Sequence, residues 1–284
     1  MANNLAAFNI DQFSKALVAN LDKINVMLPL VNRDWEGDIS RGVGSTVYVR
    51  TLGSVTMGAY TKNSTTISYE DLAPAREAFT VDDAQYFAFK VDDVDANSND
   101  LDALELYAKR AAVSLSDVVE NKILSVYGSA HADNRITGAS NAAITLSTTN
   151  IYDNFVEART RLSKKNVPTA GRFAIIDPDS YALVLKCAEF KRDTPVGDDA
   201  IRNGFVGSMA GFDIYESNSV PTASGAKYLM FGDNQAIAYA AQVTEVETIR
   251  LESSFATAVR GLLVHDAAVF AEASKRLATV KATA

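Results

Sequence analysis

One long apolar stripe limits the folds that this 284-residue chain can adopt. From Leu101 to Tyr127 apolar side chains recur at helical spacing, Asn99 or Asp100 can cap the first turn, and Gly128 suits the end. At a rise of about 1.5 Å per residue, the predicted helix has a length on the order of 40 Å. We therefore expect it to serve as a spine rather than as a packing helix of ordinary length.

The remaining elements mix strands and helices without strict alternation. An amphipathic helix is predicted over Asp11–Ile24, with a narrow apolar stripe of Phe13, Leu17, Leu21 and Ile24. Further helices are expected at Ile151–Lys164 and Ser180–Phe190, and strands at Ala84–Val91, Arg172–Ile176, Gly211–Glu216, Tyr228–Phe231, Ala236–Ala241, Glu245–Leu251 and about Val259–Phe270. This mixture favours an α+β fold over a doubly wound sheet.

A long hairpin is predicted from Ser45–Leu52 and Thr65–Tyr69, two β-branched and aromatic runs that are separated by glycines and polar residues. The two runs hold too few large apolar side chains to bury a core, and an isolated two-stranded ribbon is marginally stable in water. We therefore expect the hairpin to rest on another part of the chain or on another subunit.

Charge is unevenly placed along the chain, whose net charge is −8. Residues 69–105 carry eleven acidic and two basic side chains, whereas residues 39–68 carry three basic side chains and no acidic ones. Such runs are commonly solvated faces. The alternative is mutual complementarity, within one chain or between neighbouring copies.

Residue clusters with a recognisable chemistry are not found. His131 and His265 lie in different predicted regions, Cys187 is the single cysteine, and the calcium-loop-like run from Asp95 lacks the required glycine and glutamate. We therefore expect no catalytic, cofactor-binding or metal-binding residues, no cofactor and no enzymatic activity. The acidic total argues against a basic footprint for nucleic acid, and no stretch is apolar enough for a membrane helix.

The order of these elements resembles that of the major capsid (coat) proteins of tailed bacteriophages. The phrases that carry the resemblance are FKVDDVDANSNDLD at Phe89–Asp102, GRFAIIDPDSYALVL at Gly171–Leu185, MAGFDIYESNSVP at Met209–Pro221 and RGLLVHDAAVFAEA at Arg260–Ala273. The resemblance implies an N-terminal arm at 1–38, an extended hairpin loop at 39–70, a peripheral domain at 71–145 and 245–284 with the spine helix at 101–127, and an axial domain at 146–244.

The resemblance also implies a structural function. Many copies would assemble as hexamers and pentamers into an icosahedral shell that encloses double-stranded DNA without sequence-specific binding. A scaffolding protein, a portal protein and a decoration protein would be partners. The protein would reside in the virion capsid after assembly in the host cytoplasm.

Two sets of residues are the expected assembly interface. We expect the basic hairpin to lie across the acidic block and spine of an adjacent subunit. The hairpin set is Arg41, Arg50, Met57, Tyr60 and Lys62, and the acidic block is Asp92, Asp93, Asp95, Asp102 and Glu105.

Two other functions remain open. An encapsulin-like nanocompartment shell, which holds enzyme cargo, shares the fold, and the helix at Asp11–Ile24 would suit cargo docking. A metal-dependent hydrolase that uses the acidic block is the alternative from another class.

Overall fold

The computed structural model describes residues 25–38, 43–51, 55–66, 69, 75–92, 102–187, 205–250 and 256–283. Within these ranges the α-helices are α3 (Asp102–Ser125), α4 (Ile151–Lys164) and α5 (Pro178–Lys186). The strands are β1 (Ser45–Thr51), β2 (Ala75–Val81), β3 (Asp83–Asp92), β4 (Arg135–Ile136), β5 (Ile144–Thr145), β6 (Arg172–Ile176), β7 (Phe205–Met209), β8 (Phe212–Glu216), β9 (Thr222–Ala223), β10 (Ala226–Asp233), β11 (Ala238–Arg250), β12 (Ala256–Ala268) and β13 (Ala278–Thr283).

The larger sheet forms the main hydrophobic core together with α4. Its strand order is β4-β13-β10-β6-β8-β7, with β5 paired to β13 and β9 paired to β10. The central strand β6 is buried along its whole length, as its uninterrupted apolar sequence after Arg172 requires. Phe155 of α4 packs edge-on against Phe212 and Phe231 at centroid distances of 6.3 and 5.0 Å, which fixes the helix on this sheet.

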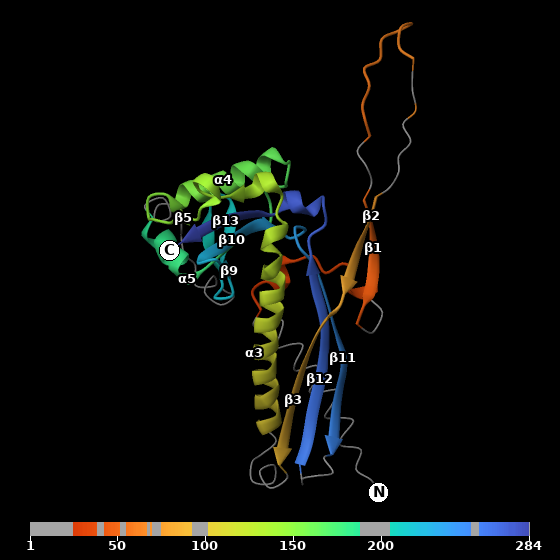
Figure 1. Ribbon diagram of the computed structural model, residues 1–284, viewed down its shortest axis with the longest axis vertical. Coiled ribbons are helices and arrows are strands. Elements are labelled where there is room, and N and C mark those ends of the chain that lie inside the picture. The colour runs from red at the N-terminus through yellow and green to blue at the C-terminus, as the bar shows by residue number, and fades with distance from the viewer. Residues whose placement is uncertain are drawn as a thin grey trace.

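The smaller sheet is long and narrow, and α3 runs along it. Its order is β11-β12-β3, with antiparallel pairing throughout (Figure 1). The end of α3 that leads into residue 126 reaches the larger sheet, whereas its first turns lie near the far end of β3 (Figure 1). The spine helix thus spans both sheets, as the long apolar stripe predicts.

The hairpin is formed by β1 and β2, which pair antiparallel from Ser45 opposite Val81 to Thr51 opposite Ala75. The predicted return strand at Thr65–Tyr69 is therefore wrong for the residues that the structure describes there, since 65, 66 and 69 lie outside strands and 67–68 are not among the described residues. The physical reason is packing. Alternation in β2 places Phe79 and Val81 on a buried face, whereas Thr65 and Tyr69 are exposed.

Most other predicted elements are confirmed, with two differences in the C-terminal part. The strands expected at Ala236–Ala241 and Glu245–Leu251 form one strand, β11, with a register shift between Val243 and Glu245. A bulge there lets the pairing with β12 continue past the break in the pattern. The final strand β13 was not predicted, and it pairs with β10 in the larger sheet, because Val280 and its alternate neighbours are buried there.

The helix predicted at Ser180–Phe190 is α5, which begins earlier at Pro178 behind Asp177 and ends at Lys186. Residues 188–190 lie outside the described ranges. The amphipathic helix predicted at Asp11–Ile24 also lies outside the described residues.

Candidate assembly interface

The tip of the hairpin, residues 55–66, projects away from both sheets and from α3 (Figure 1). Every residue of this segment is exposed, including Met57 at 91% and Tyr60 at 70%. Residues 61–65 form a tight turn at the tip. The backbone N–H of Thr61 donates to Oγ1 of Thr65 at 2.7 Å, and Asn63 adopts a positive φ. Exposed apolar residues on a shaped, projecting loop are typical of a contact surface rather than of a core.

Two arginines face each other on the paired strands of the hairpin. Arg50 lies directly opposite Arg76, and the Arg76 guanidinium lies 4.3 Å from the centre of the Tyr48 ring. Like charges directly opposite each other destabilise a strand pair, so this arrangement favours an anionic partner. Lys62 is exposed at the tip, and Arg41 lies outside the described residues.

The base of the hairpin is anchored in a small second core. Phe79 and Val81 are 1% exposed and pack with Ala240 and Val264, and Phe79 contacts Phe270 at a centroid distance of 6.2 Å. The backbone N–H of residue 271 also donates to Oε2 of Glu77 at 2.8 Å. The base is thus fixed to the smaller sheet while the tip extends freely outward.

The described residues of the acidic block lie at the opposite end of the molecule from the hairpin tip (Figure 1). Asp92 ends β3 and Asp102 begins α3, and both ends lie together at the far end of the smaller sheet (Figure 1). Glu105 follows in the first turns of α3, and 93–101, with Asp93 and Asp95, lie outside the described residues. Among the described residues, the two predicted charge sets therefore do not meet within one chain.

A charged cluster that no sequence pattern signals fastens α3 to the smaller sheet. Lys122 Nζ of α3 lies 3.1 Å from Oδ2 of Asp83 in β3 and 3.2 Å from Oδ1 of Asp266 in β12. We call these three residues the Lys122 cluster. Burial would raise the pKa of Asp83, but hydrogen bonds from Lys122 and Gln85 hold it below its usual value. Burial keeps the pKa of Asp266 above its usual value.

A buried histidine lies against the Lys122 cluster. His265 is 0% exposed, and within the described part of the chain neither ring nitrogen has a hydrogen-bond partner. Burial lowers the pKa of His265, so the ring is neutral at pH 7. No local pattern in the sequence signals either feature, because the groups come from three elements that are far apart along the chain.

A second polar contact joins α3 to the larger sheet. Ser217, which follows β8, donates its hydroxyl to Oε1 of Glu120 at 2.5 Å. Burial raises the pKa of Glu120, and the nearby carboxylate of Asp117 acts in the same direction. Glu120 is 7% exposed and Ser217 is 5% exposed, so this hydrogen bond is buried and serves to position α3.

Among the residues that the structure describes, no three His, Cys, Asp or Glu side chains cluster as metal ligands. In the same ranges no helix is long and apolar enough to cross a membrane.

Comparisons with known proteins agree with this architecture. A structure from Mycobacterium phage Che8 is similar to the chain with a TM-score of 0.70 and 24% sequence identity, over 90% of each chain. The capsid structure of cyanophage P-SCSP1u is similar with a TM-score of 0.66 and 19% identity, over 85% of each chain. The SrpI encapsulin of Synechococcus elongatus PCC 7942 is similar with a TM-score of 0.57 and 13% identity, over 85% of this chain and 83% of that one.

These likenesses show that the chain has the α+β fold of these solved structures. No curated protein sequence matches the chain. The sequence model of a family described as phage capsid protein matches residues 76–282, from β2 to the last strand. The chain therefore belongs to the phage capsid protein family, and it is a major capsid protein that self-assembles into the shell of the virion.

Proposed function

We propose that copies of this chain form hexamers and pentamers, which close into an icosahedral shell around double-stranded DNA. The hairpin of one copy lies across the acidic block and α3 of the adjacent copy. The observation that carries this proposal is the projecting hairpin tip, whose residues are all exposed although the base is firmly anchored. A ribbon with exposed Met57 and Tyr60 gains stability only when a partner covers it.

Charge supports the choice of contact. The hairpin carries Arg50 and Lys62, and the described residues of the acidic block, Asp92, Asp102 and Glu105, lie at the far end of the smaller sheet (Figure 1). This separation supports a contact between copies rather than within one chain. Each screened pair contributes about 0.2–1 kcal/mol. Repeated around every ring of subunits, such pairs set the salt dependence of assembly.

Assembly takes place in the host cytoplasm on a scaffolding protein, a portal protein occupies one vertex, and a decoration protein binds the outer surface. DNA is enclosed without sequence-specific contacts, in keeping with the net charge of −8. The chain has a structural role and no enzymatic activity.

The experiment is expression of the chain alone, followed by size-exclusion chromatography and negative-stain microscopy at low and high salt. Closed shells, capsomers or aberrant tubes are expected, and a persistent monomer contradicts the proposal. The Arg50→Ala/Lys62→Ala variant should assemble in lower yield and with weaker salt dependence. The matched control is Lys164→Ala/Lys186→Ala, which removes two exposed charges outside the hairpin and should assemble as the parent does.

The alternative expected from the sequence is an encapsulin-like shell, whose fold the SrpI encapsulin shares, but the family match favours the phage shell. An encapsulin-like shell would contain enzyme cargo rather than a genome. Nuclease-resistant DNA in particles from the natural source supports the phage shell, and particles that contain a protein cargo without DNA contradict it.

A further inference from the structure

The hairpin joins the smaller sheet through a single residue. β2 ends at Val81 and β3 begins at Asp83, so Asp82 alone separates a strand of the hairpin from a strand of the smaller sheet. On the hairpin side of this corner, Val81 is buried and packs with Val264 of β12. On the other side, Asp83 lies directly opposite His265 of β12. The position of the hairpin base therefore depends on how this corner is held to β12.

Side chains that exchange protons gather at the same corner. Nζ of Lys122 lies 3.1 Å from Oδ2 of Asp83 and 3.2 Å from Oδ1 of Asp266, and Nε2 of Gln85 donates to Oδ1 of Asp83 at 3.2 Å. Burial raises the pKa of Asp266, and the neighbouring carboxyl group of Asp82 acts in the same direction. One cation thus holds two carboxylates, each on a different strand of the smaller sheet.

His265 lies among these charged groups without a hydrogen bond. It is 0% exposed, and neither ring nitrogen has a partner within the described part of the chain. Burial lowers the pKa of His265, the carboxylates of Asp83 and Asp266 oppose this effect, and the charge of Lys122 adds to it. The ring is therefore uncharged at neutral pH.

On the β11 side the ring of His265 faces Tyr239, at a centroid distance of 6.1 Å. Burial raises the pKa of the Tyr239 hydroxyl, and the carboxylate of Glu36 acts in the same direction, so the hydroxyl stays neutral in acid. Glu36 itself accepts a hydrogen bond from Nε of Arg33 at 2.9 Å. A proton on His265 would therefore find its anionic neighbours on the side of the corner, in Asp83 and in Asp266 of the Lys122 cluster.

We propose that His265 and the Lys122 cluster form an acid-sensitive switch that holds the base of the hairpin to the smaller sheet. At neutral pH the buried ring is uncharged, and Lys122 binds the carboxylates of Asp83 and Asp266. In acid a proton from the solvent adds to His265, and the imidazolium then competes with Lys122 for Asp83. A buried charge without its own partner is costly, so the corner at Asp82 opens and water reaches the imidazolium.

Proton linkage fixes the direction of the change. In the closed corner the pKa of His265 lies below its ordinary value of 6.5, and in an opened, hydrated corner it returns to that value. The open form therefore binds more protons than the closed form, and opening becomes easier as pH falls below about 6.5. For one proton, the equilibrium constant for opening rises by up to about tenfold per pH unit.

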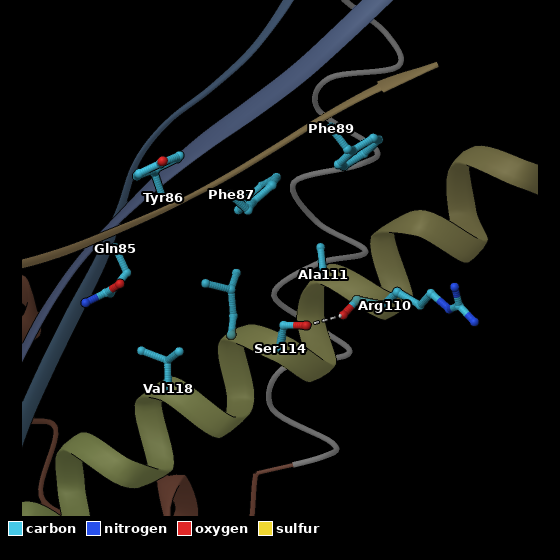
Figure 2. Close-up of a pocket in the computed structure, with 9 residues that line it drawn as sticks. Gln85, Tyr86, Phe87, Phe89, Arg110, Ala111, Ser114 and Val118 are labelled. Carbon is cyan, nitrogen blue, oxygen red and sulfur yellow. Dashed lines mark hydrogen bonds between the residues drawn. The ribbon is translucent and has the colours of Figure 1, made fainter. Parts of the chain in front are cut away.

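The contact between α3 and β3 beyond the corner is apolar and should not respond to acid. Phe87 and Phe89 of β3 face Ala111 and Val118 of α3 across a pocket of about 300 Å³ (Figure 2). The residues that line this pocket include no acidic side chain and no histidine. Opening should therefore be confined to the corner and to the hairpin strands that join it.

Such opening is a property of one chain and goes beyond the proposed function, so it can be measured whether or not shells form. Only its consequence rests on the proposed function. If the hairpin contacts the adjacent copy, a change at its base should make assembly depend on pH below about 6.5.

Hydrogen–deuterium exchange of the full-length chain at pH 7.5 and pH 5.5 tests the proposal. Rates are divided by the intrinsic exchange rate at each pH, under conditions in which exchange reports the opening equilibrium, and the assembly state is kept the same. Protection of residues 76–87 should fall by about five- to tenfold in acid. Protection of β6, residues 172–176 in the core of the larger sheet, should not change.

Two variants assign the response to the buried ring. His265→Gln keeps a neutral polar side chain that gains no proton, so it should abolish the fall in protection of residues 76–87. The matched control is His131→Gln, which removes the second of the two histidines, a partly exposed residue outside the corner, and should behave as the parent does.

Three results would overturn the proposal. The first is a fall in His265→Gln equal to that in the parent, and the second is an equal fall in residues 76–87 and 172–176, which would mean global unfolding. The third is a fall that Asp266→Asn abolishes and His265→Gln does not, which would make a carboxyl group the trigger. If His265→Gln does not fold, the pH profile of the parent decides: a fall that starts near pH 6.5 supports the switch, and one confined to pH values below 5 contradicts it.

Discussion

Removal of the positive charge from the Lys122 cluster should weaken the attachment of α3 to the smaller sheet. Lys122→Met keeps most of the side-chain volume but leaves the carboxylates of Asp83 and Asp266 without their shared cation. The side chains of Lys122, Asp83 and Asp266 are 26%, 31% and 13% exposed, between a surface pair and a buried one. Loss of one partner costs little in surface pairs and about 3–5 kcal/mol in buried ones, so we expect a loss of about 2 kcal/mol.

Thermal unfolding converts this free energy into a measurable shift. An unfolding entropy of about 2.1 cal/mol/K per residue gives roughly 0.6 kcal/mol/K for a chain of this size, so Tm should fall by about 3 °C. The assembly state and protein concentration must match between variants, because association also raises Tm. Lys275→Met is the control, since the Lys275–Glu272 pair is exposed and its loss should move Tm by less than 1 °C.

The pH dependence of this difference provides a separate test. In the parent the lowered pKa of Asp83 adds stability above about pH 3.8, the ordinary Asp value, and that stability is lost as pH falls through the folded-state pKa. In Lys122→Met the raised pKa of Asp266 rises further, so acid relieves the uncompensated charge. The gap in Tm should therefore shrink from pH 7 to pH 4. A variant that matches Lys275→Met at pH 7, or a gap that stays constant with pH, would refute the reasoning.

Three further outcomes are expected. Phe79→Ala should cost about 3–5 kcal/mol locally, because the ring fills the small core under the hairpin, and limited proteolysis should show faster cutting of the hairpin while α4 stays protected. Glu120→Gln should raise Tm at pH 8 but not at pH 4. Burial raises the pKa of Glu120, so the folded protein loses stability as pH rises and the carboxyl group ionises, and glutamine avoids this loss. A Tm that is unchanged at both pH 8 and pH 4 would contradict this. In the parent, the free energy of unfolding should fall by up to about 1.4 kcal/mol per pH unit below about pH 6.5, because the buried His265 must become protonated. His265→Met should abolish this fall, as urea titrations from pH 7 to pH 5 would measure.

Local sequence patterns predicted the elements whose buried face is marked by their own apolar residues. The helix at Ile151–Lys164 and the strand at Arg172–Ile176 were placed with the bounds that the structure shows. In both cases the apolar period alone identifies the buried face. The spine helix was predicted for the same reason, since its stripe continues over most of α3.

Elements that depend on distant partners were harder to predict. The return strand of the hairpin is β2 because Phe79 and Val81 meet Ala240 and Val264, residues that follow far along the chain. A phenylalanine and a valine in an acidic stretch suit a strand, but they do not show which distant residues the strand contacts. The bulge in β11 is equally hidden, because it depends on register with β12 rather than on its own sequence.

In the candidate interface, too, exposed residues were predictable from local sequence, whereas contacts between distant residues were not. Exposure of Met57, Tyr60 and Lys62 was predictable, because a polar, glycine-rich loop between strands has no core to enter. The groups that hold α3 in place were not, and the reason lies in helix geometry. Glu120 and Lys122 are two residues apart, so they point about 200° apart around the helix axis. One meets Ser217 beside the larger sheet and the other meets Asp83 in the smaller sheet. A helix that joins two sheets must satisfy polar groups on both sides, and only the fold tells which charged residue of such a helix is buried and which is solvated.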